Sequence, residues 1–150
     1  MNYRALIFDD QKEIRQILWS LFDSREYEVF TFPHPTLCPL SVEDHCPCPK
    51  EQACSDVIVS DMEMPFKNGF DFIEEQLNKG CKCKNIALMS GAFTNAHFDK
   101  AKSLGITIFK KPFQIASITS WLDRIEKDIG PQRILTDWYL KRIQNKNEMP

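Results

Sequence analysis

The sequence predicts an α/β fold, a doubly wound, five-stranded parallel sheet with helices on both faces. Apolar runs and amphipathic segments alternate along most of the 150 residues. The runs at residues 57–59 and 86–89 are apolar at every position, which is typical of parallel strands buried on both faces. Amphipathic segments between such strands predict right-handed crossovers, which place helices on both sides of the sheet. In such sheets, ligands bind beyond the carboxyl ends of the strands.

Each element follows from the spacing of its apolar residues. The first predicted helix, at residues 11–25, carries apolar residues at helical spacing, namely Ile14, Ile17, Leu18, Leu21 and Phe22. The predicted strands cover residues 3–8, 28–32, 56–60, 86–90 and 107–110. The other predicted helices cover residues 69–79, 95–104 and 114–129. Strand and helix therefore alternate up to about residue 129.

Two regions break this alternation. Residues 33–55 contain five prolines and four cysteines, which suit an irregular loop better than a helix. We therefore expect residues 33–55, called the insert below, to form a Cys- and Pro-rich loop in place of the second crossover helix. After Gly130, apolar residues at helical spacing predict an amphipathic helix over about residues 132–145. The chain then divides into a main domain, residues 1–129, and a C-terminal helix and tail, residues 130–150.

Composition excludes several classes of protein. The chain is 43% hydrophobic and 27% charged, which is ordinary for a globular domain. A formal net charge of -2 and a pI near 5.9 give no basic field, so direct binding to nucleic acid is not expected. The sequence has neither a signal-peptide pattern nor an apolar stretch of about eighteen residues. We therefore expect no membrane contact and a cytoplasmic location.

Acidic residues gather at the carboxyl ends of the predicted strands. Asp9 and Asp10 follow the first strand, and Asp61 follows the third. Three carboxylates in a buried setting repel one another, so they need a cation, a proton or water to coexist. Such a cluster usually indicates Mg²⁺. Ser90 and Lys111 lie at or just past the ends of the fourth and fifth strands, so the same edge would collect them.

These residues provide each part of a phosphoryl acceptor. Asp61 is the predicted nucleophile, which would form an aspartyl phosphate. Asp10 is predicted to bind Mg²⁺ directly, and Asp9 to bind it directly or through water, while the backbone carbonyl of Glu63 supplies a further oxygen. Lys111 would pair with the phosphoryl oxygens.

Four segments resemble the receiver domain of bacterial two-component response regulators. They are Phe8-Asp9-Asp10, Ser60-Asp61-Met62-Glu63-Met64-Pro65 with Gly69 after it, Ser90-Gly91 and Lys111-Pro112-Phe113. The four segments occur in the family's order, each at the end of its strand, and the resemblance spans roughly residues 3–129. It implies the flavodoxin-like strand order 2-1-3-4-5.

The resemblance also implies a phosphorylation switch. A sensor histidine kinase would donate phosphate to Asp61, Ser90 would turn inward to bind it, and the face formed by residues 95–129 would rearrange. We expect a stand-alone domain whose output is binding to a downstream protein that the sequence does not name. It would be a phosphoacceptor with at most self-dephosphorylation, not an enzyme.

One position departs from the family pattern. The family often carries Tyr or Phe three residues before its lysine as a rotating switch residue, whereas this chain has Ile108 there and Phe109 one place later. Either Phe109 takes the role through a shift of register, or the aromatic part of the switch is missing.

Two other functions stay open. The first is a phosphohydrolase with a nucleophilic aspartate, although the residue two places after Asp61 is Glu63 rather than the aspartate such enzymes use as general acid. The second is a metal- or redox-responsive interaction module in which the cysteine-rich loop is the sensor.

Six cysteines in a reducing compartment indicate metal binding or redox sensing rather than structural disulfides. Cys38, Cys46, Cys48 and Cys54 are predicted ligands of one tetrahedral Zn²⁺, with Cys81 and Cys83 as alternates and His34 or His45 as replacements for one thiolate. An iron–sulfur cluster is less favoured because the tight spacing it uses is missing. Free buried thiols and redox pairs remain alternatives.

The tail carries Trp138 and Tyr139 within its predicted helix. These aromatic residues either pack on the main domain or form a homodimer contact.

Overall fold

The computed structural model describes residues 3–38, 43–49, 52–65, 67–130, 133–136, 138 and 140. Five parallel strands form one sheet in the order β2-β1-β3-β4-β5, which confirms the predicted fold class and strand order. The strands are β1 (Tyr3–Phe8), β2 (Tyr27–Phe32), β3 (Val57–Asp61), β4 (Asn85–Ser90) and β5 (Thr107–Lys110). The α-helices in the described residues are α1 (Lys12–Ser24), α2 (Gly69–Asn78), α3 (Asn95–Leu104) and α4 (Ile115–Asp128). Every predicted bound of these elements agrees to within one residue.

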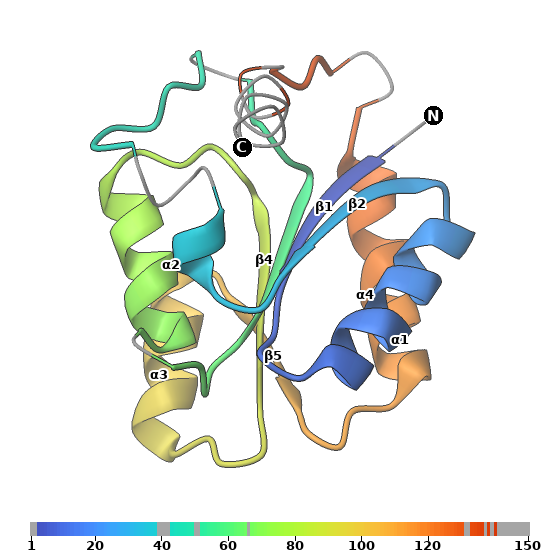
Figure 1. The fold of residues 1–150 in the computed structure, drawn as a ribbon, viewed down its shortest axis with the longest axis vertical. Coiled ribbons are helices and arrows are strands. Elements are labelled where there is room, and N and C mark those ends of the chain that lie inside the picture. The colour runs from blue at the N-terminus through green and yellow to red at the C-terminus, as the bar shows by residue number, and fades with distance from the viewer. Residues whose placement is uncertain are drawn as a thin grey trace, which may run out of the picture.

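The molecule has three layers, with the sheet in the middle. Helices α2 and α3 cover one face, and α1 and α4 cover the other, as Figure 1 shows. Two apolar clusters fill the spaces between these layers. Because both faces are covered, all five residues of β3 are buried, as the continuous apolar run predicted.

The register of the sheet fixes where the strands end. Phe8 pairs with Ser60, Asp61 with Met89, and Ser90 with Lys110. Neighbouring parallel strands therefore stop at the same edge, and the residues that follow them are brought together there.

Helices α2 and α3 begin at capping residues. The side chain of Asn68 accepts a hydrogen bond from the Asp71 amide at 2.8 Å. Thr94 and His97 form a reciprocal capping box at the start of α3. Each of these helices follows the carboxyl end of a strand. The caps therefore help to fix the loops at that end of the sheet, which we call the carboxyl edge; the opposite end is the amino edge.

The described residues between positions 33 and 55 do not form the crossover helix that usually links such strands. Within their described part, the helical structure is a single 3-10 turn at Pro35–Leu37. The rest of the described insert is irregular, as its prolines predicted. Three of its cysteines, Cys38, Cys48 and Cys54, are buried in the apolar cluster between the sheet and α2.

The tail differs from its prediction at its first residues. Residues 133–136 are irregular rather than helical, while Trp138 and Leu140 are helical. The reason is that Thr136 donates its backbone amide to Ala53 (2.9 Å) and offers its carbonyl to Arg4 (3.0 Å), so these groups bind the main domain instead of a helix. The remainder of the predicted helix and Tyr139 lie outside the described residues.

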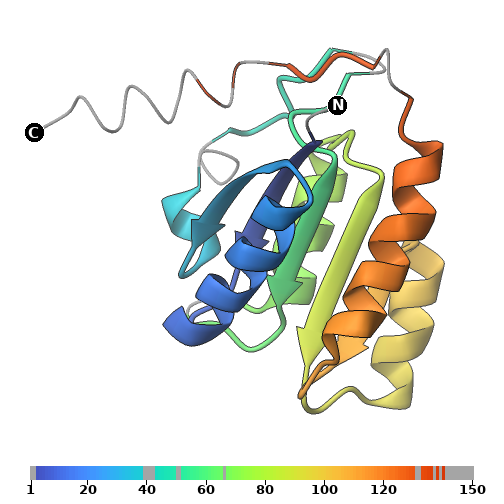
Figure 2. The ribbon, with the colours of Figure 1, turned by 90° about the vertical axis from the view of Figure 1, so that its right-hand side faces the viewer.

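Figure 2 shows residues 133–136 running beside the insert, at the amino ends of the strands. Among the described helices, none is long and apolar enough to cross a membrane.

Candidate functional site

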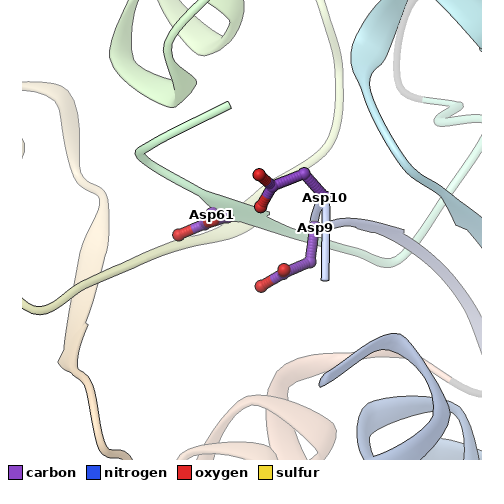
Figure 3. A group of neighbouring side chains, drawn as sticks. All are labelled: Asp9, Asp10 and Asp61. Carbon is purple, nitrogen blue, oxygen red and sulfur yellow. The ribbon is translucent and has the colours of Figure 1, made fainter. Parts of the chain in front are cut away.

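Three aspartates meet at the carboxyl edge of the sheet. Asp9 and Asp10 directly follow β1, and Asp61 is the last residue of the adjacent strand β3. Each offers a carboxylate oxygen within 4.8 Å of the other two, and Figure 3 shows the three side chains grouped at these strand ends. Asp9 and Asp61 are buried, whereas Asp10 is exposed. The site is therefore open to solvent on the side of Asp10.

Asp9 is held on both of its carboxylate oxygens. Its Oδ1 accepts the backbone amide of Gln11 at 2.8 Å, and its Oδ2 accepts the ammonium group of Lys111 at 2.9 Å. Its own amide donates to the carbonyl of Phe32 on the neighbouring strand at 3.1 Å. The position of this buried carboxylate is therefore fixed by β2, by the start of α1 and by Lys111.

Lys111 reaches the acidic cluster from the end of β5. Its backbone amide donates to the carbonyl of Ser90 at 2.8 Å, and the peptide bond to Pro112 is cis. The Nζ atom lies 3.1 Å from Oδ1 of Asp61 as well as 2.9 Å from Asp9. One ammonium group thus bridges two buried carboxylates.

Asp61 is the least satisfied group of the site. The approach of Lys111 has the distance of an ion pair but not the direction of a hydrogen bond, and no hydrogen bond from the described residues reaches Oδ1. Burial, followed by the charge of Asp9, raises the pKa of Asp61 to about 7 against the opposing effect of Lys111. Burial lowers the pKa of Lys111, but its hydrogen bond to Asp9 and the charges of Asp9 and Asp61 raise it overall.

This geometry suits a divalent cation. Carboxylate oxygens are the ligands that Mg²⁺ prefers, and an exposed carboxylate leaves room for the waters that it retains. A cation would also satisfy the buried oxygen of Asp61 and offset the repulsion between the carboxylates. The three acids therefore fit Mg²⁺, while the predicted role of the Glu63 carbonyl stays a prediction.

No protein-family model and no curated protein matches the sequence. Solved structures do match it. The chemotaxis protein CheY4 of Vibrio cholerae is 26% identical, with a TM-score of 0.65 over 83% of this chain and 99% of its own. The receiver domain of the Francisella response regulator 1452 is 19% identical, with a TM-score of 0.69 over 85% and 98%. The BeF3-activated DrrB receiver domain is 16% identical, with a TM-score of 0.68 over 85% and 99%.

The similarity to the Francisella and DrrB receiver domains establishes the fold. The match to CheY4 supports the same fold at a higher sequence identity. The acidic cluster lies at the edge of the sheet where such a fold binds its ligand. This chain has the fold of a response regulator receiver domain. Such a domain is in general a phosphoacceptor switch rather than a catalytic enzyme.

In this receiver domain, the hydrogen bond that the Ser90 hydroxyl donates goes to Glu63 and not to Asp61. The hydroxyl group donates to the Glu63 carboxylate and accepts the backbone amide of Ala92 at 3.0 Å. Ser90 is buried, whereas Glu63 is exposed. The sequence placed Ser90 in the site but missed this partner, because only the fold brings the loop after β3 to the end of β4.

The loop after Asp61 is held close to the strands. Met62 donates its amide to the carbonyl of Met89 at 2.8 Å, and Gly69 donates to the carbonyl of Met62 at 2.9 Å. A Cβ atom on Gly69 would lie 2.4 Å from the Asp61 carbonyl oxygen, closer than real Cβ atoms approach. Glycine is therefore required where α2 begins against the end of β3.

The switch position of the receiver domain holds an aliphatic residue. Ile108 pairs with Leu88 and Phe109 with Met89. Phe109 is buried on the opposite face of the sheet, against Trp121 of α4 at 5.5 Å between ring centroids. Phe109 therefore does not take the place of Ile108 through a shift of register in this structure.

The cysteines lie away from the acidic cluster. None of the six forms a disulfide, and within the described residues the aspartates alone form a group whose three ligand atoms lie within 4.8 Å of one another. The thiol of Cys48 nevertheless contacts those of Cys46 and Cys54. It also accepts a hydrogen bond from the indole nitrogen of Trp138 at 3.2 Å. Hydrogen bonding, first from Cys54, lowers the pKa of Cys48 to about 5.

This contact shows that Trp138 packs on its own domain, which is one of the two roles predicted for it. No spacing in the sequence indicated its cysteine partner. The homodimer contact stays a prediction.

Proposed function

We propose that Asp61 accepts a phosphoryl group from a sensor histidine kinase, and that the phosphorylated domain signals by binding a downstream protein. The observation that carries this proposal is the state of Asp61. Its carboxylate is buried beside a fixed ammonium group and two further carboxylates, at the open edge of the sheet. A carboxylate in this position is a nucleophile with its charge-neutralising partners already in place.

Each residue then has a separate role in the transfer. An oxygen of Asp61 attacks phosphorus while the bond from phosphorus to the donor nitrogen breaks. Asp9, Asp10 and Asp61 would hold Mg²⁺, whose charge offsets that of the phosphoryl oxygens. Lys111, already 3.1 Å from Asp61, supplies a fixed positive charge to the same group.

Ser90 gives the domain its two states. In the unphosphorylated domain its hydroxyl binds Glu63. A phosphoryl group on Asp61 offers a charged acceptor of the same kind, so the hydroxyl can exchange one partner for the other. That exchange would release the loop at Glu63 and alter the surface formed by α3, β5 and α4.

Mass spectrometry of the intact protein tests the nucleophile. Acetyl phosphate with Mg²⁺ should add one phosphoryl group to the native chain and none to Asp61→Asn. The matched control is Asp99→Asn, which removes an exposed carboxylate on α3 and should be labelled as the native chain is. Equal labelling of Asp61→Asn and the native chain would refute the assignment.

The same experiment separates the phosphohydrolase alternative. A switch domain retains its phosphoryl group for a measurable time and does not turn over external phosphate esters. Continuous release of nitrophenol from nitrophenyl phosphate, abolished by Asp61→Asn, would instead favour the enzyme.

A further inference from the structure

The amino edge of the sheet, opposite the acidic site, gathers thiols from three segments of the chain. Cys46 and Cys48 come from the insert, Cys54 precedes β3, and Cys81 precedes β4. Because β3 and β4 are parallel neighbours, the residues before them share one edge. Figure 2 shows the later, teal part of the insert at this edge, at the end of the sheet away from the arrowheads.

Backbone contacts fix these segments against one another. Cys46 donates its amide to the carbonyl of Lys79, at the end of α2, at 2.8 Å. Cys81 donates its amide to the carbonyl of Gln76, inside α2, at 3.0 Å. Both cysteines are therefore tied to the same helix end.

The sulfur atoms follow the backbone. Cys46, Cys54 and Cys81 line one small cavity together with Trp138, whose indole N–H reaches the sulfur of Cys48. The thiol of Cys81 is near enough to interact electrostatically with the other three. Four sulfurs thus gather in one place, in a part of the fold that lacks its usual helix.

The sulfur of Cys48 accepts the indole N–H of Trp138 at 3.2 Å. The insert and the tail therefore meet at this group of thiols.

We propose that Cys46, Cys48, Cys54 and Cys81 are the four ligands of a structural Zn²⁺ site that fastens the insert to the amino edge of the sheet. Four thiolates without an oxygen ligand select a soft, tetrahedral cation, and a set of four leaves no open position for catalysis. This set replaces Cys38 of the sequence-based prediction with Cys81. Cys83 is buried near the same thiols, but its thiol donates to the carbonyl of Asn85 at 3.7 Å, so we leave it out of the set.

The four sulfurs lie farther apart here than in a closed metal site, since no three described thiols come within 4.8 Å of one another. Cysteine has one side-chain torsion, χ1, so binding of an ion requires that rotation about χ1 bring the four sulfurs together. The bound ion would then link the insert, β3 and β4, and through Trp138 it would also hold the tail.

Metal analysis of the full-length protein, purified with a thiol reductant, tests the proposal. We expect one zinc per chain by native mass spectrometry. Serine substitution of Cys46, Cys48, Cys54 or Cys81 should remove it, whereas Cys38→Ser and Cys83→Ser, the matched controls, should retain it. Retention in Cys81→Ser with loss in Cys38→Ser would overturn the set of ligands, and a native chain without zinc would overturn the site unless added metal restores it.

Two further measurements keep the test decisive if a variant fails to fold. Added Co²⁺ should give the intense charge-transfer and visible bands of a tetrahedral thiolate site in the chelator-treated native chain. Six thiols that titrate equally fast with and without chelator would contradict the site. Asp61→Asn should keep its zinc, so failure of the phosphoacceptor proposal and failure of this one are distinguishable.

Discussion

Asp61 is a carboxylate that the fold keeps from ionising easily. It is 3% exposed, and its Oδ1 lacks a hydrogen bond from the described residues. Its pKa is raised to about 7, above the usual value near 4, chiefly by burial. A cation or a phosphoryl group bound at this site would relieve the unfavourable burial of the Asp61 charge. The raised pKa of Asp61 and its proposed function therefore have the same cause.

The raised pKa predicts how stability depends on pH without divalent cations. Between pH 4 and pH 7 the folded state keeps a proton that the unfolded state has released, so the free energy of unfolding falls as pH rises through this window. Asp61→Asn should remove this fall and raise the free energy of unfolding at pH 8 by roughly 1–3 kcal/mol. Urea titrations in chelator measure it. A steeper fall in Asp61→Asn than in Asp99→Asn would contradict the assignment.

The Ser90–Glu63 hydrogen bond predicts a second effect of single residues. Glu63→Ala should increase the affinity of the domain for beryllofluoride about fivefold, or by about 1 kcal/mol. The reason is that the Ser90 hydroxyl then no longer has to give up its hydrogen bond to the Glu63 carboxylate when beryllofluoride binds. Tryptophan fluorescence or calorimetry can follow the binding. In a Ser90→Ala background the same substitution should have no such effect, and an equal gain there would show that the two residues are not coupled.

At the scale of elements, the start of α2 is as important to the site as the strands. Its first residue, Gly69, lies against the carbonyl of Asp61 with no room for a Cβ atom. The helix therefore supports the strand end that carries Asp61, the proposed phosphoacceptor.

Gly69→Ala should lower the free energy of unfolding by about 1–3 kcal/mol, because the added methyl group must displace backbone. It should also slow labelling by acetyl phosphate, since the Asp61 carbonyl moves. The control is Gly130→Ala, where a Cβ atom meets nothing within 4 Å. Equal thermal stability of the two variants would show that α2 can shift away at no cost.

At the scale of the whole molecule, the two ends of the sheet carry different features. The carboxyl edge carries the acids, and the amino edge carries the insert and the start of the tail. Arg4 at the amino edge binds the carbonyls of Cys54 (2.8 Å) and Thr136 (3.0 Å). Arg133 pairs with the buried carboxylate of Asp56 through two nitrogens. Residues after α4 are thus part of the packed domain.

Arg133→Ala should therefore destabilise the domain by roughly 2–4 kcal/mol, because it leaves Asp56 buried without its charged partner. The loss should leave phosphoryl labelling unchanged, since the acidic site lies at the other edge. Thermal unfolding and acetyl phosphate labelling measure the two effects. Arg124→Ala, an exposed substitution on α4, is the control and should alter neither.

The prediction from sequence was correct where the signal was local. Apolar spacing gave the bounds of every strand and of α1 to α4 to within one residue. It failed at residues 133–136, because the backbone amide and carbonyl of Thr136 bind Ala53 and Arg4 instead of forming a turn of helix. Helical spacing records which residues can share a face, but not whether a distant segment competes for their hydrogen bonds.

The sequence by itself determined the alternation of strands and helices and the presence of acids at strand ends, because both follow from residues close together along the chain. Only the tertiary structure decided which distant groups meet. The pairing of Ser90 with Glu63, the close approach of Gly69 to Asp61, and the hydrogen bond from Trp138 to Cys48 each join segments that no spacing relates. Such contacts depend on how strands are ordered and packed, so they become visible only once the sheet is assembled.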